Sequence, residues 1–147
     1  MKKEFATMAV AAGLAVAAAS LPAMAAERIE VVERALTDAT LDLGAKGDSV
    51  GDLLTWGNPI FDALNKTQIG TDQGYCVRVV VGKSWECTWT TLLKDGQIMV
   101  EGPFYDDKDS VFTIIGGTGK YAGARGSMKL HARDAKASSY TFIFELL

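Results

Sequence analysis

The stretch from Asp95 to Arg125 constrains the fold most strongly, because it joins two apolar runs to a glycine-rich segment. The runs QIMVEGPFY and SVFTII flank the acidic sequence DDKD, and GGTGKYAG follows them. A helix does not absorb that many glycines, since each one costs about 1 kcal/mol relative to alanine. The pattern predicts a strand, a turn, a second strand and then a glycine-rich crossing loop.

The glycine-rich segment also matches a phosphate-binding pattern loosely. Gly117, Gly119 and Ala122 fit the spacing G-x-G-x-x-G/A of a dinucleotide site. Such a site needs a helix that starts at the glycines, whereas a strand-like alternating run follows here. Lys120 is followed by Tyr121, where a P-loop requires Ser or Thr. We interpret the segment as a structural loop, in which glycine supplies positive φ and close backbone approach.

The rest of the chain after its first 25 residues is also rich in strand-like runs. Apart from a segment at 54–64 that Pro59 interrupts, the further candidates are residues 29–35, 39–43, 73–81, 85–93, 127–133 and 138–147. Pro59 confines any strand around it to an edge, a bulge or broken geometry. Many short strands with frequent turns and no amphipathic helix predict an all-β fold, a closed antiparallel barrel of eight strands. An open sandwich is the alternative.

The first 25 residues have the features of a secretory signal peptide. Lys2 and Lys3 precede an apolar run from Met8 to Leu21, and the small residues at 23 and 25 form an A-x-A cleavage site. A membrane anchor is the alternative, but the run is shorter than the roughly 20 residues of a spanning helix. We expect cleavage before Ala26, a periplasmic or extracellular protein, and no membrane association afterwards.

The charge of the remaining chain, residues 26–147, excludes some partners. The sequence has 15 basic and 18 acidic residues, and the leader removes two lysines and one glutamate, which leaves a net charge near −4. No basic stripe indicates nucleic acid or an anionic membrane. The length suits one domain with one core. We expect no cofactor and no metal.

Cys76 and Cys87 lie on the two arms of one predicted hairpin. A four-residue turn would place Val79 opposite Ser84 and the two cysteines opposite each other. Directly opposed residues have Cβ atoms roughly 4.5–5.5 Å apart, close to disulfide geometry. In an exported protein we expect the pair to be oxidised. Two cysteines and one histidine provide too few ligands for structural zinc.

Aromatic residues of the same hairpin could line a pocket. Trp85, Cys87 and Trp89 share one face of their strand, and Arg78 lies on the matching side of the facing strand. An inward orientation would give an aromatic cavity with one charge, as in a small-molecule site. Glu101 is a further candidate for the interior. Ordinary core packing is the alternative, because eight-stranded barrels are often filled by their own side chains.

Several motifs resemble the allene oxide cyclase and dirigent superfamily. They are the sequence GPFY at 102–105, the run IGGTGKYAGARG at 115–126 and the closing SYTF at 139–142. The resemblance covers nearly all of the chain after the leader. It implies an eight-stranded up-and-down barrel, self-association as a dimer or trimer, and a small hydrophobic molecule as ligand.

The resemblance also nominates site residues. Glu30 aligns with a cyclase glutamate that assists opening of a fatty-acid epoxide, Asn58 with a water-binding asparagine, and Cys76 with a cavity cysteine. Strand parity leaves the direction of Glu30 open, and the resemblance makes it inward. Val32 stands where the cyclases have an asparagine, which departs from their pattern.

Two functions follow from the resemblance. The first is a cyclase or isomerase, with Glu30 as the catalytic acid. The second is a dirigent-like binding protein without catalysis, which orients intermediates made by another enzyme. A buried carboxylate with a raised pKa would favour the first.

Overall fold

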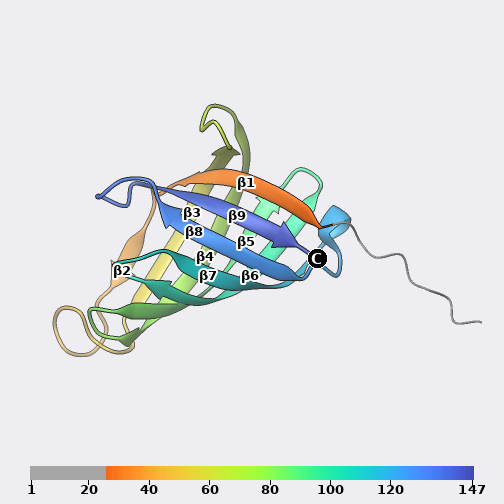
Figure 1. Cartoon of the computed structure of the whole chain (residues 1–147). Coiled ribbons are helices and arrows are strands. Elements are labelled where there is room, and N and C mark those ends of the chain that lie inside the picture. The colour runs from red at the N-terminus through yellow and green to blue at the C-terminus, as the bar shows by residue number, and fades with distance from the viewer. Residues whose placement is uncertain (1–25) are drawn as a thin grey trace, which may run out of the picture.

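A computed structural model describes residues 26–147 as a β-barrel (Figure 1). The elements are β1 (Glu27–Arg34), β2 (Ala39–Leu41), β3 (Leu53–Asp62), β4 (Gln68–Val80), β5 (Ser84–Leu93), β6 (Gly96–Tyr105), β7 (Ser110–Gly117), the 3-10 helix η1 (Gly119–Tyr121), β8 (Gly126–Ala132) and β9 (Ser139–Leu146). The predicted signal peptide lies outside the described residues. Within residues 26–147, no helix has the length and apolar character needed to cross a membrane.

Eight of the strands form a closed antiparallel wall. Strands β3 to β9 pair with their neighbours in sequence, and β1 pairs with β9 along its whole length. The barrel closes because β1 also pairs with β3, from Val31 to Glu33. The short strand β2 pairs only with β3. This confirms the predicted eight-stranded barrel, and the open sandwich is wrong.

The core lies inside the barrel, where alternate residues of every strand meet. Trp89 lies at its centre, with ring centroids 4.4 Å from Phe112 and 5.7 Å from Phe142. Both phenylalanines and Val100 are almost completely buried. Each aromatic side chain buries roughly 150–250 Å² of surface. A few of them therefore fill most of a barrel this narrow.

The glycine-rich segment closes one end of the barrel, as predicted. Gly119 has φ of 60°, and a Cβ there would overlap the carbonyl oxygen of Asp95. The neighbouring N–H of Lys120 donates to that same oxygen at 2.8 Å. The turn brings the ring of Tyr121 into the barrel end, where it is 8% exposed. Glycine is required here by close backbone approach and by a left-handed φ.

Strand β3 continues through Pro59, where an edge, a bulge or broken geometry was expected. Pro59 pairs with Thr71 of β4, and the register shifts only after it, between Ile60 and Phe61. On its other edge, β3 pairs with β2 near its start and with β1 near its end. Between these two pairings, the segment that links β1 to β2 crosses beside the middle of β3. The missing N–H of proline is tolerated because no strand needs it in that gap.

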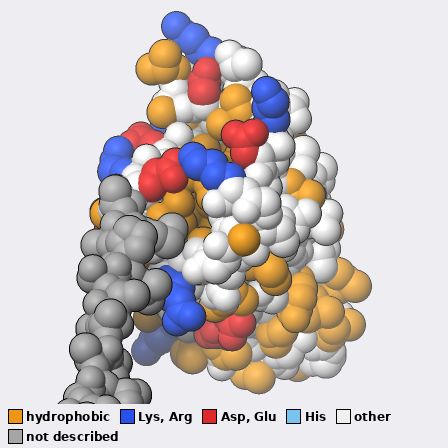
Figure 2. Space-filling model, turned by 90° about the vertical axis from the view of Figure 1, so that its right-hand side faces the viewer, with side chains coloured by type: hydrophobic (Ala, Val, Ile, Leu, Met, Phe, Trp, Pro, Cys, Tyr) orange, Lys and Arg blue, Asp and Glu red, His pale blue; other side chains and the backbone are white. Residues whose placement is uncertain are grey.

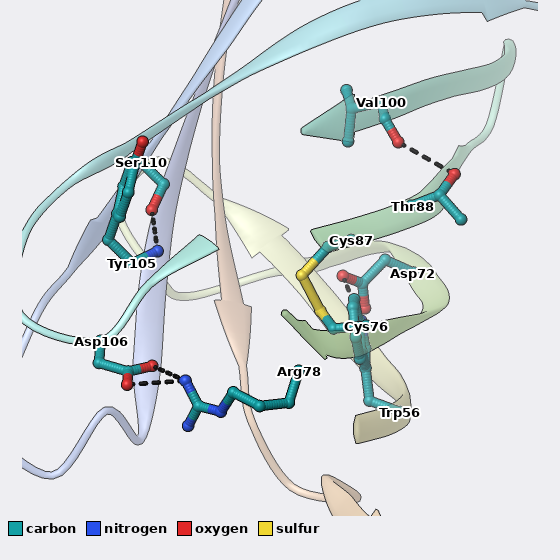
Figure 3. The surroundings of a disulfide bond; sticks show 10 residues. All are labelled: Trp56, Asp72, Cys76, Arg78, Cys87, Thr88, Val100, Tyr105, Asp106 and Ser110. Atoms are coloured by element: carbon teal, nitrogen blue, oxygen red, sulfur yellow. Dashed lines mark hydrogen bonds and ion pairs between the residues drawn. A yellow bond between two sulfur atoms is a disulfide. The ribbon is translucent and has the colours of Figure 1, made fainter. Parts of the chain in front are cut away.

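The hairpin of β4 and β5 holds the disulfide Cys76–Cys87, whose Cα atoms are 4.0 Å apart (Figure 3). The predicted pairing of the two cysteines is confirmed. The expected pairing of Val79 with Ser84 is wrong, because Ser84 pairs with Val80. Val79 is the extra residue of a β-bulge, which absorbs the offset before the register reaches the cysteines.

Candidate functional site

A small cavity of about 40 Å³ lies inside the barrel, next to the disulfide. The walls are mainly apolar, and the rings that line it are Trp56, Trp89, Phe104, Tyr140 and Phe142. Both half-cystines also contact the cavity, together with two carboxyl side chains. This volume admits a few atoms of a ligand or a few water molecules.

Gly74 of β4 makes room for the two tryptophans. It pairs with Trp56 on β3 and with Trp89 on β5, and the two indole rings meet edge to face with centroids 5.7 Å apart. A Cβ at Gly74 would overlap the Cβ of Trp89. A larger residue would therefore push Trp89 out of the cavity wall.

A carboxyl cluster lies at the end of the cavity where β1 leaves the barrel. Glu33 of β1 is 5% exposed, and Asp38 follows in the loop before β2. The amide Nδ2 of Asn58 donates to Glu33 Oε1 at 2.8 Å and to Asp38 Oδ1 at 2.7 Å. Asn58 thus holds both carboxyl groups from one side.

The orientation of the Asn58 amide is fixed by the crossing between β1 and β2. Its Oδ1 accepts the backbone N–H groups of Leu36 and Thr37, each at 2.9 Å. These two N–H groups lie where neither β1 nor β2 pairs with β3. The Asn58 side chain takes the place of the missing hydrogen bonds between strands there. Because its Oδ1 faces these N–H groups, its Nδ2 faces the carboxyl groups.

Burial raises the pKa of Glu33 well above its ordinary value, and the nearby charge of Asp72 adds to this. Burial likewise raises the pKa of Asp72 to about 6, against hydrogen bonds from Trp56 and Glu33. The Trp56 Nε1–H donates to Asp72 Oδ2 at 3.2 Å, and Figure 3 shows the two side chains together. Of this pair, Asp72 therefore ionises first as pH rises, and Glu33 holds its proton to higher pH.

Tyr140 forms part of the partition between this cavity and the surface. Tyr140, Phe104 and Leu130 line the cavity on one side and an open basin of about 300 Å³ on the other. The rings of Phe104 and Tyr140 meet edge to face at 6.1 Å. Burial, followed by the charges of Glu33 and Asp38, raises the pKa of Tyr140 to about 12. The basin lies between the β6–β7 turn and the β8–β9 loop.

Comparison with known proteins places this barrel in a family. A family model described as allene oxide cyclase matches residues 21–145. The chain belongs to the allene oxide cyclase family.

Solved structures with the same barrel have varied names. A pyocyanin demethylase matches with a TM-score of 0.69 and 22% identity, over 80% of this chain and 100% of its own. The pterocarpan synthase dirigent protein PsPTS1 matches with a TM-score of 0.67 and 12% identity, over 84% and 94%. AbnU, an exo-specific intermolecular Diels-Alderase, matches with a TM-score of 0.62 and 12% identity, over 83% of this chain and 98% of its own. At these identities the likeness establishes the fold.

In this allene oxide cyclase family member, the nominated acid Glu30 does not reach the cavity. It lies on the opposite face of β1 from Glu33, and its Oε2 accepts from Arg28 at 2.8 Å in an exposed ion pair. The expected inward orientation is therefore wrong. The alternation Ile29, Val31, Glu33 forms the inward face, because these residues pack in the core or line the cavity.

The remaining predicted pocket residues divide into three groups. Asn58, Cys76 and Trp89 belong to the cavity or its carboxyl cluster. Glu101 is exposed on the outer face of β6, so its proposed interior position is wrong. Arg78 and Trp85 face inward but lie outside the cavity lining.

Arg78 and Trp85 instead tie the loops at one barrel end. The guanidinium stacks on Trp85 at 4.0 Å from the ring centroid, and Nη1 donates to both carboxylate oxygens of Asp106 at 2.9 and 2.8 Å. Nε also lies 2.6 Å from Asp48 Oδ1. Figure 3 shows Arg78 with Asp106. Because two carboxylates already hold it, this arginine is not a free charge for a ligand.

Sequence reasoning missed several site residues, among them Glu33, Asp72, Trp56 and Tyr140. Asp72 alternates with Gly70 and Gly74 on the inward face of β4, so no apolar periodicity marks that face. Tyr140 belongs to the closing SYTF motif, which indicated only the family. The sequence did contain a signal that Glu33 faces inward. Its face of β1 carries the apolar residues Ile29 and Val31, whereas the face of Glu30 also carries the charged residue Arg34.

Proposed function

We propose that this barrel binds a small hydrophobic molecule and catalyses its cyclisation or isomerisation, with Glu33 as the acid. The observation that supports this most directly is a buried carboxyl group with a raised pKa that borders an aromatic cavity. A carboxylic acid that keeps its proton at neutral pH can donate a hydrogen bond or a proton to oxygen as negative charge develops on it.

The neighbours of Glu33 match this role. Asn58 holds one oxygen of the carboxyl group, which leaves the protonated oxygen free to turn between Asp72 and a ligand. The aromatic walls exclude water, so a hydrogen bond to the reacting group is stronger there than at the surface. An elongated apolar substrate that folds in such a space is brought into a reactive conformation by the walls.

The ligand occupies the basin as well as the cavity in this proposal. The basin of about 300 Å³ is at the lower limit of common ligand pockets, whereas the cavity alone is far below it. Movement of Tyr140 and Phe104 would join the two spaces. The ligand's reactive end then reaches Glu33, and the rest stays in the basin.

The family match and the names of the structural neighbours also support this function. The cyclase description of the family and the Diels-Alderase among the neighbours both denote ring formation, and the dirigent protein is the precedent for the non-catalytic alternative. The buried acid favours catalysis over orientation alone.

Native mass spectrometry of the protein purified from its host would identify the bound molecule and the number of subunits. Turnover of that molecule would then be compared between the wild type, Glu33→Gln and the matched surface control Glu30→Gln. Loss of the acid should reduce turnover by roughly 10²–10⁴-fold and leave affinity nearly unchanged. If Glu33→Gln and the wild type turn over the molecule equally, Glu33 is not the acid. If neither turns it over while both bind it, the barrel is a binding protein.

We also propose export and self-association. N-terminal sequencing of periplasmic or extracellular protein should begin at Ala26, and a retained Met1 would contradict export. Exposed hydrophobic side chains on the outer faces of β4, β6 and β7 support self-association, among them Tyr75, Met99 and Val111. Figure 2, which views the end that carries the C-terminus, shows hydrophobic side chains gathered along the lower edge of that view. The same mass spectrum would show a dimer or trimer.

A further inference from the structure

We propose that the ligand of this cavity is an aromatic cation, a flat ring system with a positive charge spread over a ring nitrogen. The inference rests on the proposed function and specifies its substrate class. It starts from the carboxyl groups that face the cavity and from the charges that would balance them.

Glu33 and the exposed Asp38 line one end of the cavity, and the buried Asp72 contacts Glu33 from outside the lining. Within residues 26–147 no basic side chain lines this cavity. The partners of these three carboxyl groups are the amide of Asn58 and the indole N–H of Trp56. Within residues 26–147, none of the three takes part in an ion pair. Buried carboxylates are ordinarily balanced by a cation, so a positive ligand would supply the missing charge.

One buried acceptor of this cluster has no hydrogen-bond donor other than Glu33. Asp72 is 1% exposed, and its Oδ1 has no hydrogen-bond partner among the described side chains and backbone groups, apart from a proton shared with Glu33. The indole N–H of Trp89, which is 4% exposed, also has no partner in the described part of the chain. A buried carboxylate oxygen without a partner favours positive charge nearby, whereas the Trp89 N–H would need an acceptor atom on the ligand.

The cavity walls suit a delocalised cation. Trp56 and Trp89 present two indole rings, the best cation–π partners among side chains, and Phe104 and Tyr140 add two more rings at the entrance. A metal ion fits less well: within residues 26–147 no group of three or more acidic, histidine or cysteine side chains is arranged to hold one. Aromatic walls plus acids indicate an organic cation.

The entrance has the same sign of charge. The basin is lined by one lysine and by four aspartates, Asp106, Asp107, Asp109 and Asp134. The lysine, Lys108, lies over the ring of Tyr105 at 4.2 Å from its centroid. Arg78 balances Asp106, and Lys129 with His131 balances Asp109, which leaves Asp107 and Asp134 without an ion pair in the described chain. An approaching cation meets no repulsion there.

A cationic ligand has a consequence for protons. The titratable groups that face Glu33 are Asp38, Asp72 and Tyr140, all of them acids, so the only way for this site to gain negative charge is to lose a proton. Binding of a cation should therefore shift the Glu33–Asp72 pair toward its ionised form and release part of a proton, so affinity should rise with pH. The fraction of Glu33 that stays protonated serves the proposed acid role. A neutral ligand of the same shape should release none.

Three isosteric probes test the proposal on the wild-type protein without its leader. They are 1-methylquinolinium, its neutral isostere 1-methylnaphthalene, and the anion 1-naphthoate. Isothermal titration in phosphate and in Tris at pH 7 gives both affinity and proton release. We expect the cation to bind at least about tenfold more tightly than the neutral isostere, about 1.4 kcal/mol. It should also release about half a proton or more.

Variants then locate the preference. Asp72→Asn and Glu33→Gln should each reduce the preference for the cation at least about threefold and leave binding of 1-methylnaphthalene within about twofold. Glu30→Gln, on the outer face, should leave both unchanged. The wild-type comparison stands by itself if a variant does not fold.

Other outcomes separate this inference from the proposed function. If 1-methylnaphthalene or 1-naphthoate binds as tightly as the cation, the charge preference is wrong and the hydrophobic binding site remains. If none of the three probes binds at millimolar concentration, both the preference and the proposed site are wrong.

Discussion

Asn58 donates its side-chain amide to Glu33, with 2.8 Å between Nδ2 and Oε1, and both residues are buried. The same amide accepts two backbone N–H groups of the crossing between β1 and β2. The Asn58 side chain therefore links three parts of the barrel: the segment between β1 and β2, the carboxyl group of Glu33, and Asp38. Structure and proposed chemistry depend on the same residue.

Replacement of Asn58 by alanine should lower stability strongly. The N–H groups of Leu36 and Thr37 and one oxygen of Glu33 would lose their partner, and each buried group left unpaired costs about 1–3 kcal/mol. We expect a decrease of at least about 2 kcal/mol in the free energy of unfolding, measured by urea denaturation. Glu30→Gln is the surface control. A change within about 0.5 kcal/mol, typical of surface substitutions, would show that water replaces the amide.

The raised pKa of Glu33 predicts that stability falls as pH rises. The folded state holds a proton that the unfolded chain has already lost above its ordinary pKa, so the folded state binds more protons and stability declines with pH. Asp72 contributes with the same sign between its ordinary pKa of 3.8 and about 6. The decline therefore starts near pH 4, and the raised pKa of Glu33 adds to the loss that Asp72 alone would cause.

Glu33→Gln isolates this effect. Glutamine keeps the acceptor for Asn58 and can donate to Asp72, as the protonated acid does. Urea denaturation from pH 4 to pH 8 should show a flatter profile for the variant, with up to about 1.4 kcal/mol per pH unit lost only by the wild type. Asp52 and Asp62 have lowered pKa values, so their effect falls below pH 4, outside this window. Parallel profiles would mean that Glu33 is ionised in the folded protein.

The barrel was predictable from the sequence because every strand of its wall repeats the same pattern, an alternation of inward and outward residues that ends in a turn. Alternation, hairpin turns and the motif at 115–126 indicated the same closed sheet, and the pairing of Cys76 with Cys87 followed from the hairpin. The site was less predictable. Glu30 and Glu33 lie on opposite faces of β1, and a shift of one residue in the alignment exchanges the two faces. The apolar residues of the strand are a better guide to its inward face than such an alignment.

The carboxyl pair itself could not be read from the chain. Glu33 and Asp72 are far apart in sequence, and the pair forms only because β1 and β4 both border β3. Asp72 lies between two glycines on its face of the strand, so neither charge nor periodicity marks it as buried. Closure of the barrel decides which polar residues are inside, and closure depends on pairings between distant segments.

Gly74→Ala should disrupt the tryptophan wall. The new methyl group would overlap the Cβ of Trp89 and the backbone oxygen of Thr88, so β4 and β5 must separate or the ring must move. Overpacking of this kind costs roughly 1–3 kcal/mol. Near-ultraviolet circular dichroism should show a changed tryptophan environment. Gly116→Ala in β7, where a Cβ has open space and φ is not left-handed, is the matched control.

The disulfide should be complete and should stabilise the fold. Thiol counting on the denatured protein without reductant should find no free cysteine, because Cys76 and Cys87 are bonded and no other cysteine is present. Reduction, or the double variant Cys76→Ala/Cys87→Ala, should lower the free energy of unfolding by on the order of 2–3 kcal/mol. Two free thiols in the exported protein would contradict the bond.

Tyr140 should control the rate at which a ligand enters. Its ring lines the cavity on one side and the basin on the other, so Tyr140→Ala joins the two spaces without touching Glu33 or Asp72. If entry requires the ring to move, the association rate of 1-methylnaphthalene should increase about ten- to a hundredfold, the range over which such rates vary among variants of one site. Stopped-flow tryptophan fluorescence measures this rate.

Tyr140→Phe is the matched control, because it keeps the ring and removes only the hydroxyl group. It should associate at the wild-type rate. If both variants accelerate binding equally, the hydroxyl group and its hydrogen bonds to a ligand or water set the rate, and the ring does not act as a partition. If neither changes the rate, the ligand enters elsewhere and the basin is not the route to Glu33.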